Sequence, residues 1–339
     1  MCLCGKNENN INMEQEQEMF NQRTDLSELS QAVEQIRTQL GKIIVGQTAT
    51  IDLLIAGLLA NGHLLLEGVP GVAKTLSAKL VAKSISATFS RIQFTPDLMP
   101  SDVLGTAVFS PKTAEFQFRQ GPIFGNIILV DEINRAPAKT QSALFEAMEE
   151  RQVTVDGNTY KMEEPFMVLA TQNPIEQEGT YRLPEAQLDR FLFKIEIQYP
   201  SLEEEIEILT QQHQTDTLHQ LEDIKPVLNV AQITALRATI KALHVEAKLL
   251  AYAAQIVNET RQNKALYLGA SPRASLAIIN SAKAIAAMAG RDFVTPDDIV
   301  KVATPVLAHR VMLSPEKEME GLTTADIIAQ IIKKIEVPR

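Results

Sequence analysis

The stretch from Leu64 to Thr75, LLLEGVPGVAKT, constrains the fold of this chain more than any other part. Its three leucines form a short apolar run typical of a buried strand, and the segment after them leads into a helix expected to begin near Lys74. Gly68 and Gly71 let the backbone approach an anion, and the amides of residues 72–75 lie at the positive end of that helix. The pattern therefore predicts a strand, a phosphate loop and a helix.

The side chains of this stretch predict a site for a nucleotide and Mg²⁺. Lys74 is expected to reach the terminal phosphates, and the Thr75 hydroxyl to bind the metal ion. Ala73 stands where the general pattern GxxxxGK[ST] has glycine, so a simple glycine-rich turn remains an alternative on this stretch alone. The predicted nucleotide-binding residues are Gly68, Val69, Pro70, Gly71, Val72, Ala73, Lys74 and Thr75.

Polar residues end two other apolar runs. Asp131 and Glu132 follow the run 127–130, and Asn173 follows the run 166–171. Open parallel sheets bind ligands at the carboxyl ends of their strands, so these side chains are expected near the phosphate loop. There Asp131 would bind Mg²⁺, Glu132 would orient and deprotonate the attacking water, and Asn173 would bond the phosphate or the water. The structural alternatives are strands that run into a polar loop and a turn-forming Asn before Pro.

Two further strands, 89–94 and 193–197, complete a predicted five-stranded α/β unit. Pro- and Gly-punctuated segments near 106–118 and 151–161 predict two inserted hairpins. Beyond the Pro200–Ser201 corner we expect helices only, because every periodic segment there has helical spacing. The predicted domains are a disordered polar leader (1–25), an α/β nucleotide-binding domain (26–200) and a smaller all-α domain (201–339).

The turn Val45–Gly46–Gln47 lies between two predicted helices, with Thr48 as the expected N-cap of the second. Its position suits either an adenine pocket or a simple helix-helix turn, and the spacing does not separate these readings.

Arg273 has an unusual expected position. Ser271 can cap a helix and Pro272 can begin it, which puts Arg273 in the first turn against the helix dipole. The placement is favourable if Arg273 and the helix end share an anion, and an exposed, solvent-screened arginine is the alternative.

The composition limits the class of protein. A net charge of −10 argues against a body built to bind duplex nucleic acid. Cys2 and Cys4 are the only cysteines, which favours surface thiols in a reducing compartment over a closed zinc site. The Asn-, Gln- and Glu-rich leader has no apolar core, and no segment is long and apolar enough for a membrane span, so we expect a cytoplasmic protein.

Taken together, these motifs resemble the MoxR family of AAA+ ATPases, over a region from about Leu26 to the end of the chain. The resemblance is carried by EGVPGVAKT (67–75), DEINRAP (131–137), ATQNP (170–174), LPEAQLDRF (183–191) and SPRAS (271–275). It implies a core sheet of order 5-1-4-3-2 followed by a helical lid, and Ala73 fits this family's own phosphate loop.

The resemblance also implies roles for individual residues. Lys74 and Thr75 match Walker A, the Asp131–Glu132 pair matches Walker B, Asn173 matches sensor 1, and Arg273 matches the sensor-2 arginine of the lid. The candidate arginine finger is Arg190, which would act in trans on ATP held by a neighbouring subunit, although a local pair with Asp189 is an alternative. A role for Arg135 is not assigned.

Members of the family form rings, commonly hexamers, with hairpins that face the pore. The resemblance therefore implies a Mg²⁺-dependent ATP-hydrolysing motor that acts as a chaperone-like remodelling or maturation factor. Proteins with a von Willebrand factor A domain, or their clients, are the implied partners. A nucleic-acid-acting ring ATPase and a scaffold that binds nucleotide without cycling are the alternatives.

Overall fold

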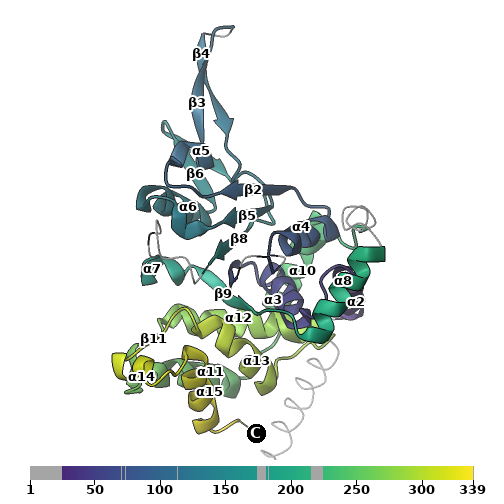
Figure 1. Cartoon of the computed structure of the whole chain (residues 1–339), viewed down its shortest axis with the longest axis vertical. Coiled ribbons are helices and arrows are strands. Elements are labelled where there is room, and N and C mark those ends of the chain that lie inside the picture. The colour runs from purple at the N-terminus through teal and green to yellow at the C-terminus, as the bar shows by residue number, and fades with distance from the viewer. Residues whose placement is uncertain are drawn as a thin grey trace, which may run out of the picture.

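The computed structural model of the chain describes residues 25–69, 71–72, 74–112, 114–173, 181, 183–214 and 224–338. Residues 1–24 of the expected leader and the predicted site residues Pro70 and Ala73 lie outside this set. A central sheet has helices on both faces, two hairpins beyond one side and a helical part at the other (Figure 1).

Five parallel strands form the central sheet in the order β2-β5-β8-β1-β9. Counted along the chain, these core strands have the order 5-1-4-3-2, which confirms the expected topology. Their residues are mostly buried Ile, Leu, Val and Phe, as a parallel sheet covered on both faces requires. The strands are β1 His63–Gly68, β2 Phe89–Gln93, β5 Ile127–Asp131, β8 Met167–Gln172 and β9 Phe191–Ile197.

The alternation of side chains along β1 divides the core between the two faces. Leu64 and Leu66 belong to the hydrophobic cluster that includes the helices α2, α3 and α4, and Leu65 belongs to the cluster on the α6 face. The expected N-cap Thr48 is wrong by one residue, because the helix begins at Thr48 and Gln47 is its N-cap. The helices are α2 Ser27–Gly41, α3 Thr48–Leu59, α4 Lys74–Ser84 and α6 Ala138–Glu150, with a 3₁₀ turn at Ile133–Arg135 and a short α7 at Glu185–Leu188.

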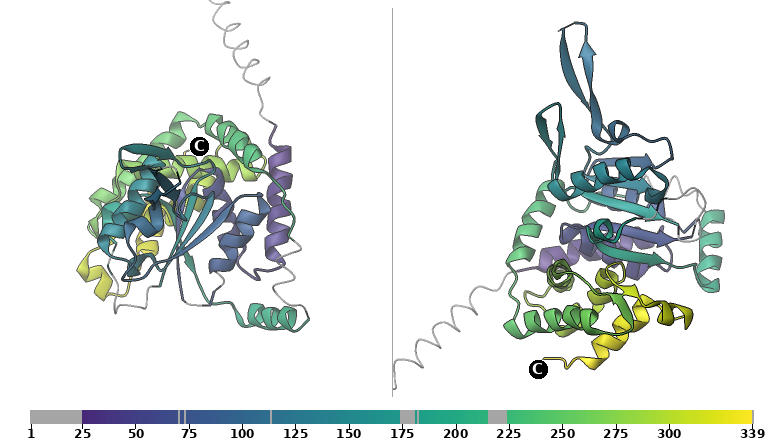
Figure 2. Two further views of the ribbon diagram at one scale, coloured as in Figure 1. Left: turned by 90° about the horizontal axis from the view of Figure 1, so that it is seen from above. Right: turned by 90° about the vertical axis from the view of Figure 1, so that its left-hand side faces the viewer.

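Both predicted hairpins are present and extend from the same side of the sheet (Figure 2). The second hairpin turns at Asp156 and Gly157, which have φ values of 49° and 79° as a two-residue hairpin turn requires. Phe118 of the first hairpin stacks on Tyr160 of the second, with ring centroids 4.1 Å apart. The segments are α5 Pro100–Leu104, β3 Gly105–Ser110, β4 Glu115–Gln120, β6 Gln152–Val155 and β7 Asn158–Lys161.

The chain after β9 is helical, with one exception. The expectation of no further strand is wrong, because β10 (Leu266–Leu268) and β11 (Met312–Leu313) form a small antiparallel pair. These strands are too short for their alternation to stand out in the sequence. The helices are α8 Leu202–Gln214, α10 Val230–Ala242, α11 Ala247–Gln262, α12 Pro272–Met288, α13 Pro296–Leu307, α14 Pro315–Met319 and α15 Thr324–Lys334.

One hydrophobic cluster continues from the sheet into this helical part. Helix α12 packs against α3, and α13 packs against β9, so residues of both parts share a core. The domain division at Pro200–Ser201 stays a prediction. Within the described residues, none of the helices combines the length and apolar character that a membrane span needs.

A buried histidine at the start of β1 ties this strand to β8 and to helix α6. His63 Nδ1 accepts a hydrogen bond from the Val168 amide at 2.9 Å, and Nε2 lies 3.1 Å from the Met148 carbonyl oxygen. One nitrogen accepts and the other donates, which only the neutral imidazole can do. Burial, and then the positive charge of Arg151, lower the pKa of His63 to about 3.

We expect the fold to lose stability as the pH falls below about 6.5, since unfolded chains then bind a proton that folded His63 excludes. The contribution of His63 to the slope of the unfolding free energy against pH approaches ~1.4 kcal/mol per pH unit, until the pH reaches the pKa of the folded state. In urea unfolding between pH 7 and 5, His63→Asn should be less stable at pH 7 and should lose this part of the slope. His213→Asn, at an exposed site, is the control. An unchanged slope in the His63 variant would contradict the assignment.

Candidate functional site

The phosphate loop lies between the end of β1 at Gly68 and the start of α4 at Lys74. Gly71 has a φ of 88°, a left-handed conformation that glycine adopts without strain. The Lys74 ammonium donates a hydrogen bond to the Gly68 carbonyl oxygen at 2.5 Å, so the lysine folds back across the loop. Lys74 and Thr75 are both half-buried in the first turn of α4, where backbone amides favour an anion.

The turn Val45–Gly46–Gln47 contacts this loop directly. Gln47 Nε2 donates to the Val72 carbonyl oxygen at 3.5 Å, and Gln47 Oε1 is buried without a hydrogen-bond partner. Glu204 of α8 packs on Gly46, whose φ of 76° favours glycine. The amino group of a base could satisfy such a buried acceptor beside a phosphate loop, and the adenine pocket stays a prediction.

Asp131 and Glu132 end β5 at the same edge of the sheet. Asp131 is buried, accepts a hydrogen bond from the Thr171 hydroxyl at 3.2 Å and pairs with Arg91 at 2.7 Å. Glu132 adopts a left-handed conformation, with φ 56° and ψ 52°, and its amide donates to the Thr171 hydroxyl at 3.0 Å. This conformation turns the chain sharply directly after the strand.

Three residues that the sequence analysis did not assign hold these carboxylates. Gln93 Nε2 donates to Glu132 Oε2 at 2.9 Å, and Arg135 Nε lies 3.0 Å from the same oxygen. Arg91, the partner of Asp131, stands two residues before Gln93 on β2. Gln93 lies beside Asp131 because β2 and β5 are neighbouring strands that pair at these two residues. The amino-acid sequence does not show which strands pair, so it gives no signal for this contact.

Asn173 follows β8 between the loop and the acids. β8 pairs with β1 on one side and β5 on the other, and Gln172 is in register with Glu67, the residue before Gly68. Asn173 is buried at this edge. The structure therefore brings the phosphate loop, the acid pair and Asn173 to one edge of the sheet.

The two candidate arginines lie elsewhere. Arg190 Nη2 pairs with Glu149 Oε2 at 2.8 Å, and Arg273 Nη2 pairs with Glu149 Oε1 at 2.6 Å. The alternative of a local pair between Arg190 and Asp189 is wrong, because Asp189 pairs with Arg310. Arg273 does stand in the first turn of α12, as expected.

Strand register separates these arginines from the phosphate loop. Arg190 precedes Phe191, which pairs with His63 at the start of the six-residue strand β1, whereas Gly68 ends it. At about 3.3 Å per residue, the two ends of β1 are ~17 Å apart. Glu149 follows Met148, whose carbonyl contacts His63, so the arginines are on the amino-end side of the sheet.

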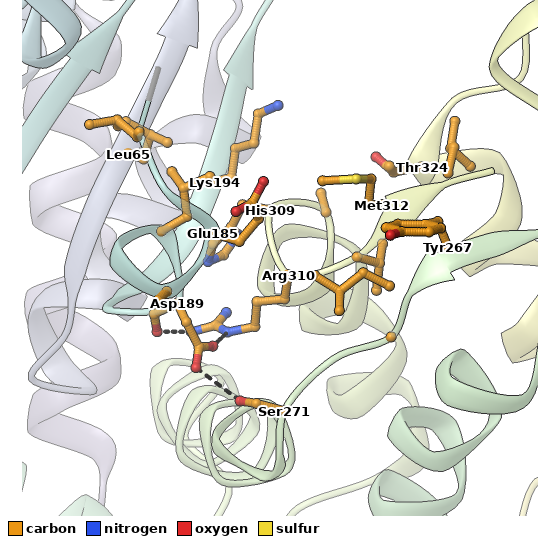
Figure 3. Close-up of a pocket in the computed structure, with 18 of the residues that line it drawn as sticks. Leu65, Glu185, Asp189, Lys194, Tyr267, Ser271, His309, Arg310, Met312 and Thr324 are labelled. Atoms are coloured by element: carbon orange, nitrogen blue, oxygen red, sulfur yellow. Dashed lines mark hydrogen bonds and ion pairs between the residues drawn. The ribbon is translucent and has the colours of Figure 1, made fainter. Parts of the chain in front are cut away.

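Asp189 joins the sheet to the helical part (Figure 3). It accepts hydrogen bonds from Arg310 Nε at 2.7 Å and from the Ser271 hydroxyl at 2.9 Å. Ser271 is the N-cap residue of α12 by position, but its expected side-chain cap is absent because the hydroxyl bonds Asp189 instead. Burial lowers the pKa of the Arg310 guanidinium, and Asp189 offsets part of this effect.

A cavity of about 840 Å³ lies beside this pair, between the helical part and the sheet. Glu67, Lys194 and Tyr267 are among its lining residues. None of the predicted site residues that the structure describes lines it, although Glu67 and Gln172, which do, directly precede Gly68 and Asn173.

We expect Asp189→Ala to destabilise the fold by ~3–5 kcal/mol, because it leaves the buried charge of Arg310 unpaired. The double variant Asp189→Leu, Arg310→Met should lose less free energy of unfolding than either single variant, since no buried charge remains. Urea unfolding measures both. The exposed pair Lys317–Glu320 provides the control, where Lys317→Ala should cost under ~1 kcal/mol. An Asp189→Ala variant as stable as this control would contradict the role of the pair.

The sheet order, the phosphate loop before α4 and the helical part after β9 define an AAA+ ATPase with a helical lid. The model described as "ATPase family associated with various cellular activities (AAA)" matches residues 63–193, and an AAA lid domain model matches residues 258–331. The crystal structure of a protein from Cytophaga hutchinsonii described as a "putative ATPase" superposes with a TM-score of 0.83 at 39% identity, covering 97% of this chain and 99% of the other.

The chain belongs to the MoxR family. It is 48% identical to the uncharacterized protein YeaC of Bacillus subtilis, over 91% of this chain and 95% of YeaC. It is 44% identical to Chaperone MoxR1 of Mycobacterium tuberculosis, over 89% of this chain and 81% of MoxR1. These relatives confirm the resemblance that the sequence motifs carried.

Proposed function

We propose that this chain is the subunit of a Mg²⁺-dependent, ATP-hydrolysing ring, and that each active site forms between two copies. The separation of the site carries the proposal: the phosphate loop and acids occupy one edge of the sheet, and Arg190 with Arg273 lie near the other. A head-to-tail contact between copies brings these two edges together, and such contacts close into rings.

Exposed apolar side chains support a contact of this kind. Helix α8, whose Glu204 contacts the turn beside the phosphate loop, exposes Leu202, Ile206 and Leu209 at helical spacing. On the arginine side, Leu276 of α12 is 67% exposed, close in sequence to Arg273. Helix α7 ends two residues before Arg190. Figure 1 shows α7 and α8 at opposite sides of the sheet, so the arginine side and the exposed surface of α8 do not meet within one chain. The glutamates of α8 complement the arginine side in charge.

The residues at the carboxyl edge fit ATP and Mg²⁺. The Asp131 carboxylate and the Thr75 hydroxyl are oxygen donors of the type that Mg²⁺ prefers, and the bound ion would neutralise phosphate charge. To bind the ion, Asp131 would give up its ion pair with Arg91. To bind a phosphate, Lys74 would give up its hydrogen bond to the Gly68 carbonyl oxygen. Glu132 would orient and deprotonate water, Asn173 would hold the phosphate or the water, and Arg190 and Arg273 would act on the developing charge.

We expect Glu132→Gln to bind ATP normally and to lose turnover by ~100-fold or more, since the amide cannot accept the proton of water. Fluorescent-nucleotide binding and phosphate release measure the two properties. Glu163→Gln, at an exposed site, should behave as the unaltered protein. Ordinary turnover in Glu132→Gln would remove this residue from the proposed role of base.

Subunit mixing tests the shared site. Lys74→Ala and Arg190→Ala chains should each release almost no phosphate when assayed alone. The Arg190→Ala change should lower the rate of phosphate release by ~10³-fold. Mixed rings contain intact sites, because the loop of an Arg190→Ala chain then meets the arginine of a Lys74→Ala chain. Recovery of phosphate release on mixing is the expected result. Two inactive variants that stay inactive when mixed, although they co-assemble in size-exclusion chromatography, would place Arg190 in its own chain's site.

We propose that the ring acts on protein clients in the cytoplasm, as a chaperone-like remodelling factor. The first hairpin exposes Phe109 and Phe116, an edge-to-face aromatic pair suited to grip an unfolded or extended polypeptide. A hexamer and partners with a von Willebrand factor A domain follow from the family alone. Capture of clients by the Glu132→Gln chain would identify them.

A nucleic-acid motor is the weaker proposal. The net charge is −10, and Arg151, one of the few basic residues on the hairpins, is paired with Glu164. Stimulation of phosphate release by DNA with a steep salt dependence would favour it. A scaffold that binds ATP without cycling would be favoured by absent turnover at concentrations where rings form.

A further inference from the structure

Glu149, at the end of α6, holds two arginines from distant parts of the chain. Its Oε2 accepts from Arg190 Nη2 at 2.8 Å and its Oε1 from Arg273 Nη2 at 2.6 Å. Each carboxylate oxygen therefore binds one guanidinium, and the two cations stand side by side. Neither the phosphate-loop motif nor the arginine motifs point to Glu149, since it belongs to the stretch between them.

The charge around Glu149 is not balanced. Two guanidinium groups face one carboxylate, and the positive end of α12 adds to the excess because Arg273 is in its first turn. Arg273 keeps 58% of its side chain exposed, whereas Arg190 Nε is buried without a hydrogen-bond partner. This cluster therefore carries an excess of positive charge, and the exposed part of Arg273 can meet a second anion.

The parts around the cluster are fixed. Asp189, next to Arg190, binds Arg310 and the Ser271 hydroxyl, and Ser271 precedes the helix that carries Arg273. Arg190 also lies over the Phe145 ring at 5.9 Å from its centroid. The backbones on both sides are thus held, and Glu149 sets where the two guanidinium groups point.

We infer that Glu149 is a positioning residue that presents Arg190 and Arg273 as one pair to the terminal phosphates of the nucleotide bound by the next subunit. The inference rests on the proposed ring. It assigns Arg273 to a neighbour's site, because the carboxylate that holds it is on the amino-end side of its own sheet, ~17 Å along β1 from its own phosphate loop. A shared carboxylate also makes the two arginines act as a unit.

The first experiment measures steady-state phosphate release by the full chain with Glu149→Gln and Glu149→Ala. We expect kcat to fall ~10- to 100-fold with KM for ATP within ~3-fold, because a displaced guanidinium weakens charge stabilisation while the loop that binds ATP is intact. Glu150→Gln, an exposed neighbour on the same helix, should keep the unaltered kcat. Thermal unfolding and size-exclusion chromatography verify that the variants fold and assemble.

The second experiment separates positioning from a general structural defect. Glu149→Gln chains mixed with Lys74→Ala chains should recover phosphate release, since intact arginines then face intact loops. Mixed with Arg190→Ala chains they should not recover, and Glu149→Gln combined with Arg190→Ala should lose no more than Arg190→Ala alone.

The outcomes are distinguishable from failure of the proposed function. If the unaltered chain releases no phosphate at ring-forming concentrations, the proposed function fails first. If the unaltered chain is active and Glu149→Gln matches or exceeds its kcat, or is rescued equally by both mixing partners, the positioning role is overturned.

Discussion

The parallel pairing of the five core strands is the constraint on which the rest of this structure depends. Parallel strands place every carboxyl end at one edge of the sheet. Strand pairing alone therefore brings residues far apart in the sequence, such as Gly68, Asp131 and Asn173, to the same edge. The same pairing places the amino ends at the opposite edge. The residues near those ends, Glu149 and Arg190, therefore lie away from the phosphate loop of their own chain.

The lid is held to the sheet by two different interactions. The apolar cluster that α12 and α13 share with α3 and β9 provides most of the buried contact, and it has no directional preference. The ion pair of Asp189 and Arg310 restricts how the lid is oriented on the sheet, because a buried guanidinium tolerates few positions of its carboxylate. Packing thus attaches the lid, and the ion pair sets the orientation in which α12 begins.

Local patterns predicted the elements of this fold well, and the contacts between elements poorly. Runs such as 127–130 predict a buried strand from composition alone, and the topology followed from a family resemblance rather than from periodicity. The partners of Glu132 and Arg190 were not foreseen, because Gln93 and Glu149 are ordinary polar residues in sequence and gain meaning only from strand register and helix position. Asp189 next to Arg190 suggested a pair, yet the buried Arg310 binds it instead, since burial makes an unpaired charge costlier than an exposed one. The short strands β10 and β11 fall below the length at which alternation is visible.

The hydrogen bond between Gln93 and Glu132 connects the acid to the first hairpin. Gln93 is the last residue of β2, an edge strand of the sheet, and the chain passes from it through α5 into the aromatic hairpin of β3 and β4. The chain therefore runs without interruption from that hairpin to the side chain that restrains the Glu132 carboxylate, and Phe118 stacked on Tyr160 ties the second hairpin to the first. The edge strand β2 thus links a surface exposed to other molecules with the acid at the carboxyl edge of the sheet.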